Sequence, residues 1–234
     1  MLNFTTAETL RASSDRSNLQ YLIQRVPERG TVHESLVEEV IRICNIDLER
    51  WRDIGMQTSA RSICFVRSKK VGLILAERLD CFFYHGDLEL SERQEMITAW
   101  SQGRRSPIMI ATVAFGAGVD YPSIRRIIHV DAPFGLLNYA QETGRAGRDG
   151  LPAVCLTLLG IEWTVSWDQG FQSDFLVEDR MQMTRFLQSG FTKCLRQSLT
   201  AYLNGGSRVT CVKDPATEHG SLACSSCLLV SSSQ

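Results

Sequence analysis

Five short, nearly continuous apolar runs alternate with segments of helical periodicity from residue 31 onward. The runs cover residues 62–66, 81–85, 108–112, 126–130 and 153–159. Runs of this kind are typical of parallel strands that helices cover on both faces. Because helical segments separate the strands, the sequence predicts an α/β fold with a doubly wound parallel sheet.

The helical segments carry apolar residues at helical spacing and end near a glycine or a turn. They cover residues 35–51, 69–79, 91–103 and 136–147, and residues 183–206 are expected to form two helices broken near Gly190. Ligands of doubly wound sheets bind beyond the carboxyl ends of the strands. We therefore expect the functional residues in the loops after residues 66, 85, 112 and 130.

Charge and composition exclude a binding protein that works through a strongly basic surface. The formal net charge is −1 and the isoelectric point is near 6.4. Affinity for nucleic acid must therefore come from a local arrangement of charges. With 234 residues and 44% hydrophobic content, one α/β domain with an extension fits best.

The eight cysteines are expected in a reducing, intracellular protein. No apolar stretch approaches the roughly 18 residues of a membrane span, and the first residues lack the basic and apolar regions of a secretion signal. In such a protein cysteines serve as core residues or metal ligands. Four fall in apolar or helical patterns and are expected in the core: Cys44, Cys64, Cys81 and Cys155. The other four gather near the C-terminus: Cys194, Cys211, Cys224 and Cys227.

The decapeptide QETGRAGRDG at 141–150 places Arg145 and Arg148 three positions apart between glycines. Arginines at this spacing project from one side of a helical turn, and the glycines allow a ligand or backbone to approach closely. Several bidentate donors aimed at one place suit a polyphosphate whose charge grows during transfer. A solvated basic turn is the alternative for two arginines alone, but the whole decapeptide favours the phosphate site.

The decapeptide resembles motif VI of the superfamily 2 helicases, and in this wording it is most similar to the RecQ family of DNA helicases. SICFVRSKK at 62–70 resembles motif IV, and IMIATVAFGAGVDYPSIRRIIHVDAP at 108–133 resembles motif V. YHGDLELSERQEMITAWSQG at 84–103 resembles the family's Tyr-His-Ala-Gly-Leu segment, and RASSDRSNLQYLI at 11–23 resembles the segment that opens the second RecA-like lobe. The resemblance implies a RecA-like parallel sheet flanked by helices and followed by a small helical zinc-binding subdomain.

The same resemblance implies four parts of the chain. Residues 1–30 form a lead-in segment, residues 31–165 the C-terminal RecA-like lobe of a helicase, residues 166–230 the helical zinc-binding subdomain, and residues 231–234 a disordered tail.

For the nucleotide, the resemblance implies that Arg148 is an arginine finger that reaches the γ-phosphate of ATP. Arg145 and Gln141 would support it, Asp120 would contact the ribose, and Gly118 would belong to the same site. The cofactor would be ATP with Mg²⁺, shared with a first RecA-like lobe.

For the nucleic acid, the resemblance implies that Thr112 and the turn from Gly116 to Gly118 grip the phosphates of single-stranded or unwinding DNA. A loop at a strand end can do so because it offers backbone N–H groups and a hydroxyl. Arg67 and Ser68, after the motif IV strand, are weaker candidates for the same groove.

Three further polar residues of these segments have less certain roles. His85 is either a direct contact of the ligand or only a polar residue at a strand end. Arg125 and Arg126 are expected in a solvated turn.

The C-terminal cysteines suggest a structural zinc site. Cys224 and Cys227 form CxxC, which lets two thiolates meet one tetrahedral zinc, and the other two can complete a closed site. RecQ proteins carry such a module behind the second lobe, opened by a helix like CLRQSLTAYLNGG at 194–206. The interval from Cys194 to Cys211 matches the family, whereas a longer interval than in the family's CxxCxxC precedes Cys224. Two alternatives stay open: His219 replaces a cysteine, or the four thiols bind no metal.

The parts that would hold ATP in a first lobe are not found in this sequence. No lysine follows a glycine, which excludes GxxxxGK[ST], and there is no Asp-Glu dipeptide for a DExH box. One hypothesis is the C-terminal half of a RecQ-like ATP-dependent 3′–5′ DNA helicase, nuclear and dependent on a first lobe in cis or in trans. The other is a non-catalytic DNA-binding or helicase-binding module, and an inactive gene product is a third. The intact motif residues favour the first.

Overall fold

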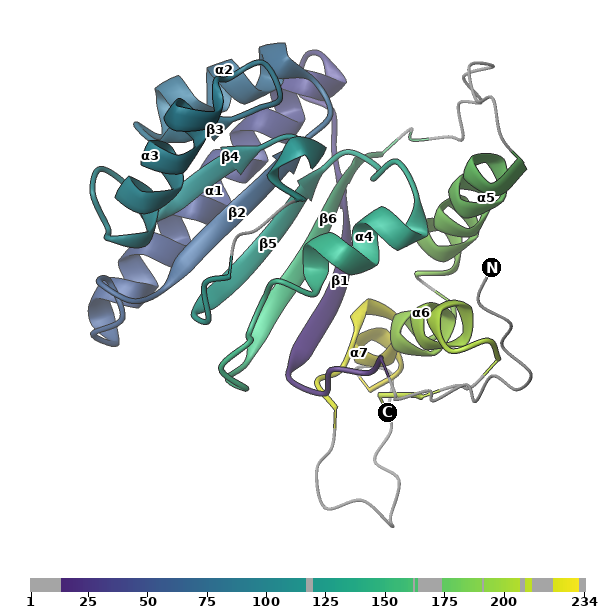
Figure 1. Cartoon of the computed structure of the whole chain (residues 1–234). Coiled ribbons are helices and arrows are strands. Elements are labelled where there is room, and N and C mark those ends of the chain that lie inside the picture. Colours follow the sequence, from purple (N-terminus) through teal and green to yellow (C-terminus); the bar gives the residue numbers. More distant parts are fainter. Residues whose placement is uncertain are drawn as a thin grey trace, which may run out of the picture.

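The sheet of the computed structural model is six-stranded and parallel throughout (Figure 1). The structure describes residues 14–116, 120–161, 163, 174–190, 192–206, 209–211 and 221–231. The strands are β1 (Leu19–Val26), β2 (Arg61–Val66), β3 (Phe82–Tyr84), β4 (Ile108–Ala111), β5 (Ile124–Val130) and β6 (Ala153–Gly160), in the order β1-β6-β5-β2-β4-β3. The predicted parallel α/β sheet is confirmed.

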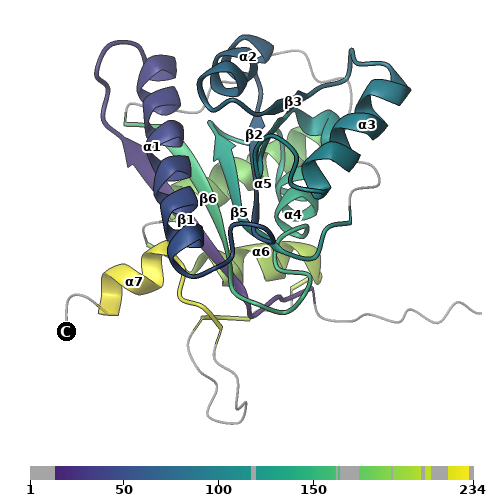
Figure 2. The same cartoon turned by 90° about the vertical axis from the view of Figure 1, so that its left-hand side faces the viewer.

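Helices cover both faces of the sheet (Figures 1 and 2). They are α1 (Val32–Asp53), α2 (Lys69–Arg78), α3 (Leu90–Ser101), the short 3₁₀ helix η1 (Val113–Gly116), α4 (Leu136–Thr143), α5 (Asp174–Ser189), α6 (Leu195–Leu203) and α7 (Ser225–Ser231). Buried side chains of α1 and α2 share one core with the strands, and those of α3 to α6 share the other. The molecule is therefore a three-layer sandwich with the sheet in the middle.

Helix α1 begins where the sequence supplies a reciprocal cap. The Thr31 hydroxyl accepts from the Glu34 N–H at 3.2 Å, and the Glu34 carboxylate accepts from the Thr31 N–H at 2.9 Å. Both N–H groups would otherwise lack a partner at a helix start. The buried face of α1 includes Leu36, Val37 and Val40, so the amphipathic helix predicted from residue 35 is confirmed.

The segment before residue 31 contributes a strand of the sheet and is more than a lead-in. Strand β1 pairs with β6 along its whole length, from Leu19 opposite Ala153 to Val26 opposite Gly160. Its side chains alternate between fully and partly buried, as expected for the edge strand of a sheet. Such alternation produces no continuous apolar run, which is why the five predicted strands did not include it.

The C-terminal segment lies along the outer edge of β1. The Ile23 N–H donates to the Ser225 hydroxyl at 2.7 Å, and the Gln20 side-chain amide donates to the Ala223 carbonyl at 2.9 Å. Arg196 of α6 is fully buried and donates to the carbonyls of Arg16 and Leu19. The cysteine-bearing part of the chain is thus packed against the sheet, and helices α6 and α7 lie beside β1 in Figure 1.

The expected solvated turn at Arg125 and Arg126 is wrong, because both residues belong to β5. The Arg126 guanidinium forms two hydrogen bonds of 2.6 Å with the carboxylate of Asp47 on α1, and only 5% of the Asp47 side chain is exposed. Arg125 is buried and pairs with Asp149. Acidic partners far away along the chain allow these arginines to lie inside the protein.

The two helices expected around Gly190 are confirmed as α5 and α6. A Cβ at Gly190 would lie 2.3 Å from the Cδ1 of Ile23, so the break between the helices leaves room only for glycine. Helix α4 ends at Thr143, and the following GRAG is a turn, so the helix expected over 136–147 was drawn too long. Of the tail expected at 231–234, Ser231 belongs to α7 and the rest lies outside the described residues.

Candidate functional site

Residues 144–150, here called the arginine loop, are held tightly by backbone contacts. Gly147 has a φ of +55°, and a Cβ there would lie 2.5 Å from the side-chain nitrogen of Asn18. The Gly147 carbonyl accepts from Arg16 at 2.7 Å and from Asn18 at 2.8 Å, and its N–H donates to the Ile124 carbonyl at 2.9 Å. Glycine is required here because other residues rarely adopt this backbone conformation and have no space for a side chain.

Asp149 anchors the other side of the loop. Its carboxylate accepts from Arg125, from the Ser123 hydroxyl at 3.1 Å and from the Leu151 N–H at 3.1 Å. The hydrogen bond from Arg125 holds the pKa of Asp149 below its usual value. The acid of the decapeptide therefore fixes the backbone beside Arg148 and leaves the arginine to face outward.

Arg148 meets Asp120, which is far away in the sequence. Their side chains pair at 2.7 Å, and 38% of the arginine and 76% of the aspartate are exposed. Arg145 is buried, and burial lowers its pKa, as does the positive charge of Arg148 nearby. Gln141 is exposed on α4, and Gly118 lies outside the described residues. The structure thus brings together Arg145, Arg148 and Asp120, three of the expected nucleotide residues.

A buried histidine and glutamate pair lies behind the arginine loop and was missed by the sequence analysis. The His129 Nε2 lies 2.8 Å from the Glu142 carboxylate, and both side chains are buried. The ring of Phe65 stacks on His129 with centroids 5.4 Å apart. Because Glu142 is on α4 and His129 is on β5, the pair joins the helix that ends at the arginine loop to the sheet. A polar His inside an apolar run was the signal that could have found it.

The arginine loop lies at the edge of the sheet where the strands begin, here called the amino edge. The Gly147 N–H donates to the carbonyl of Ile124, the first residue of β5. The Gly147 carbonyl accepts from Asn18, which directly precedes β1. Helix α4 runs back against the strand direction, so the chain that leaves β5 at its carboxyl end returns to the amino edge before the arginines. These arginines therefore lie at the edge opposite to the carboxyl ends, where the functional residues were expected.

The expected DNA residues do lie at the opposite edge, the carboxyl edge. Thr112 directly follows β4 and is partly exposed, and Gly116 ends η1. The Ser68 hydroxyl accepts from the Val71 N–H at 3.4 Å and so caps the start of α2. Arg67 is exposed after β2, with its guanidinium carbon 4.5 Å from the centroid of the Phe134 ring. The sheet separates these residues from the arginine loop.

His85 stays at the strand end where the sequence placed it. Its ring lies 4.8 Å from that of Phe83, and its Nδ1 is buried without a hydrogen-bond partner among the described residues. These contacts leave its direct role a prediction.

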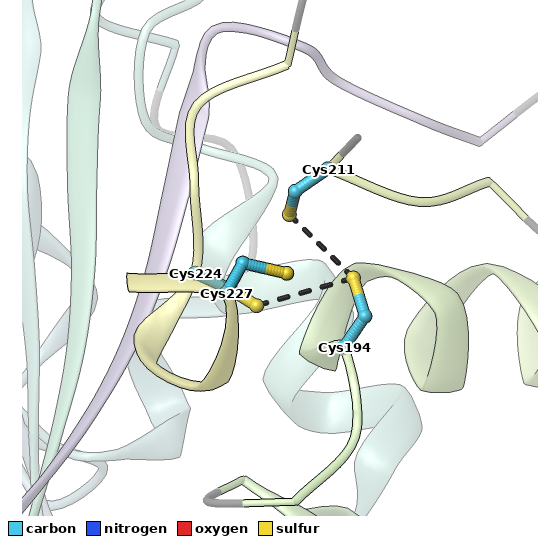
Figure 3. Close-up of side chains that lie close together, drawn as sticks. All are labelled: Cys194, Cys211, Cys224 and Cys227. Atoms are coloured by element: carbon cyan, nitrogen blue, oxygen red, sulfur yellow. Dashed lines mark hydrogen bonds between the residues drawn. The ribbon is translucent and has the colours of Figure 1, made fainter. Parts of the chain in front are cut away.

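The four C-terminal cysteines come together as the sequence predicted (Figure 3). Their sulfur atoms all lie within 4.8 Å of one another; Cys194 Sγ is 3.6 Å from that of Cys211 and 3.9 Å from that of Cys224. Tetrahedral zinc with Zn–S bonds of about 2.3 Å needs sulfurs about 3.8 Å apart. The four thiols therefore fit a closed metal site.

The thiols also differ in how readily they lose a proton. Hydrogen-bond contacts with Cys194 and Cys211 hold the pKa of Cys224 well below its usual value, while the contact with Cys194 raises the pKa of Cys211. The Leu195 N–H also donates to the Cys224 sulfur, at 3.3 Å. A thiolate is the form that binds metal. His219, the alternative ligand, lies outside the described residues. The remaining cysteines are buried in the core, as predicted.

The comparisons with known proteins agree with this geometry. Residues 42–150 match the family model of the helicase conserved C-terminal domain. The chain is 35% identical over 159 residues to the putative ATP-dependent DNA helicase Q1 of Caenorhabditis elegans, a match that covers 67% of this chain. It is 37% identical over 133 residues, 54% of this chain, to the ATP-dependent DNA helicase RecQ of Synechocystis. The chain contains a RecQ-like helicase C-terminal lobe.

The match covers about a quarter of the length of these relatives: 24% of the C. elegans protein and 27% of the Synechocystis protein. Solved structures show the same RecA-like fold. The C-terminal domain of the DEAD-box protein Dbp5 matches with a TM-score of 0.52 at 18% identity, over 82% of this chain and 88% of that one. Saccharomyces cerevisiae Dbp5 bound to RNA and ADP BeF3 also matches with a TM-score of 0.52, at 19% identity, over 77% of this chain and 43% of that one.

None of the helices among the described residues is long and apolar enough to cross a membrane.

Proposed function

We propose that this chain is the C-terminal half of a RecQ-like ATP-dependent DNA helicase, which works only with a first RecA-like lobe in cis or in trans. The observation that carries the proposal is the arginine loop, whose backbone is clamped while Arg148 stays exposed on it. A fixed backbone with an outward guanidinium is what a finger needs to reach a nucleotide held by another lobe.

In this proposal Arg148 contacts the γ-phosphate of ATP, and Arg145 and Gln141 support it. The exposed pair with Asp120 contributes only about 0–1 kcal/mol, so Arg148 can exchange that carboxylate for a phosphate at little cost. Asp120 is then available for the ribose, next to Gly118. Mg²⁺ and the remaining phosphate contacts come from the first lobe, because the sequence of this chain has no GxxxxGK[ST] loop.

At the carboxyl edge, Thr112, Gly116, Ser68 and Arg67 contact the backbone of single-stranded DNA. The Ser68 cap points the first N–H groups of α2 toward this edge, and such groups attract phosphate. Nucleotide and DNA then lie at opposite edges of the lobe, so that closure of the ATP site moves the DNA grip. The proposal includes the 3′–5′ direction and the nuclear location, which the resemblance to the family suggests.

We further propose that Cys194, Cys211, Cys224 and Cys227 hold one structural zinc ion. The mutual distances of the four sulfur atoms support this. With four protein ligands no position is open, so the zinc stabilises the fold and takes no part in the reaction.

The test is the DNA-stimulated ATPase activity of the chain with and without a separately purified first lobe of a RecQ-type helicase. The chain alone should show no activity above background, and the first lobe should restore it. Arg148→Ala should then lower the rate by about 10³-fold or more, since fingers contribute that much where they have been measured. Arg104→Ala, which changes an exposed arginine outside the decapeptide, is the matched control and should keep the rate.

Two outcomes would contradict the proposal. Robust turnover by the chain alone would show that no first lobe is needed, and equal rates for Arg148→Ala and the wild type would remove the finger. DNA binding without any ATPase in the presence of first lobes would favour the non-catalytic binding module.

A further inference from the structure

Two arginine–aromatic pairs lie next to the expected DNA residues, and the helicase motifs do not account for the aromatic members. In the first pair, Arg67 follows β2 and Phe134 follows the neighbouring β5. The Arg67 guanidinium lies over the Phe134 ring at 4.5 Å, and 37% of Phe134 is exposed. The exposed part of the Phe134 ring is a partly open aromatic surface at a strand end, which a ligand can contact.

The second pair extends the same edge by one strand. Trp163 follows β6, which lies beside β5. The backbone N–H of Trp163 donates to the Gly160 carbonyl at 3.0 Å. Arg25 donates to the carbonyls of Gly160 and Trp163 at 3.2 and 3.3 Å, with its guanidinium carbon 5.4 Å from the indole centroid. Both pairs are therefore fixed to the ends of adjacent strands.

One hollow is lined by both aromatic residues and by Arg67 of the first pair. Its other lining residues are Ala132, Pro133 and, from α5, Arg180, Met183, Thr184 and Leu187. No carboxylate is among the described residues that line it. Two acids lie near the strand ends: the Asp131 carboxylate accepts from the Ala132 N–H at 2.7 Å, and the Glu28 carboxylate lies 3.8 Å from where a Cβ at Gly160 would be. The hollow thus combines positive charge with aromatic surface.

We propose that Phe134 and Trp163 form a platform for the bases of single-stranded DNA, with the phosphates on Arg67 and Arg180. The proposal rests on the proposed function, because Arg67 belongs to both surfaces and joins the platform to the grip around Thr112. Proteins that track single strands combine arginines along the backbone with aromatic rings under the bases, and any base can stack there. The arginines that lie over the rings hold them in place, so little side-chain freedom is lost when a base stacks.

The experiment measures binding of the full chain to a fluorescein-labelled oligothymidylate, and to the same oligonucleotide with abasic sites in place of its bases. Phe134→Ala should weaken binding to oligothymidylate roughly fivefold or more, because about one stacked base is lost. Binding to the abasic strand should change little. Leu151→Ala, which changes an exposed apolar residue at the amino edge, is the control and should bind both strands as the wild type does.

A second measurement covers Trp163, whose replacement could disturb the core against which it packs. An oligonucleotide with 5-iododeoxyuridine, irradiated with the wild-type chain, should crosslink to peptides that contain Phe134 or Trp163.

Equal affinity of Phe134→Ala and wild type, together with crosslinks elsewhere, would overturn the platform. If Thr112→Ala still weakened binding in that case, the proposed DNA grip would stand without it. Equal weakening on both strands would also overturn stacking, and no binding of DNA by the wild type would overturn both proposals. Crosslinks to these peptides would also count against the platform if the wild type bound the oligothymidylate and the abasic strand equally well.

Discussion

At the scale of single residues, Gly147 decides whether the arginine loop can form. Gly147→Ala places a Cβ 2.5 Å from Asn18 and 2.8 Å from the Leu151 carbonyl, at a φ of +55°. We expect it to lower the free energy of unfolding by about 1–3 kcal/mol, since strain and steric overlap add. In the presence of a first lobe it should also lower the ATPase rate, while oligonucleotide binding at the other edge is retained. Urea unfolding and the two functional assays measure this.

Gly150→Ala is the matched control for this change. Gly150 also has a positive φ, +81°, but nothing lies within 4 Å of its added Cβ. It should therefore lose less stability than Gly147→Ala. Equal losses would show that backbone strain alone matters and that the contacts with Asn18 do not position the loop.

Single residues also show how far the sequence could predict the site. Arg145 and Arg148 were identifiable because the whole decapeptide is local in the chain. The structure adds a contact between Arg148 and Asp120 that the sequence could not show, and their role at a nucleotide stays a prediction. The roles of Arg126 and Arg125 could not be predicted, because their acidic partners are remote in sequence and nothing local distinguishes a buried arginine from a solvated one.

At the scale of elements, the ion pair between α1 and β5 joins a helix to the middle of the sheet. Asp47→Asn removes the charge that compensates Arg126, and breaking a buried pair in this way costs about 3 kcal/mol. We expect a lower midpoint of urea unfolding with an unchanged slope. Glu49→Gln, an exposed acid on the same helix, should leave the midpoint within the error of the measurement. A similar midpoint for Asp47→Asn would mean that water reaches Arg126 and replaces the carboxylate.

Elements differed in how well the sequence predicted them. The central strands and α1 were predicted because burial on both faces, or on one helical stripe, leaves a strong periodic pattern. Strand β1 was not predicted, because an edge strand buries alternate residues only, and because its partner β6 is remote in the sequence. The placement of the arginine loop at the amino edge was missed because it depends on the direction of α4 and not on any residue of the loop.

At the scale of the whole molecule, the C-terminal segment and the sheet form one packed body. Side chains of α5 and α6 share a core with β1 and α4, and Arg196 binds the carbonyls that precede and begin β1. The boundary between residues 165 and 166 therefore reflects the resemblance to the family. Side chains on its two sides pack together in one core. No local pattern carries this information, because it depends on contacts between the two ends of the chain.

This packing gives the proposed zinc ion an effect beyond its own ligands. Cys194 is the N-cap of α6, Cys224 precedes α7, and Ser225 hydrogen-bonds to the backbone of β1. Loss of the metal should therefore loosen this edge of the sheet as well. The purified chain should contain about one zinc per molecule, as a closed four-cysteine site requires. Chelation should lower the melting temperature and speed hydrogen exchange in β1 before the central strands β2 and β5. Cys227→Ser should lose zinc, whereas Cys155→Ala, a buried cysteine of β6, should keep it. Zinc below about half an equivalent in the wild type would contradict the site, and unchanged exchange in β1 after chelation would mean that the cysteine cluster and the sheet edge are stabilised independently.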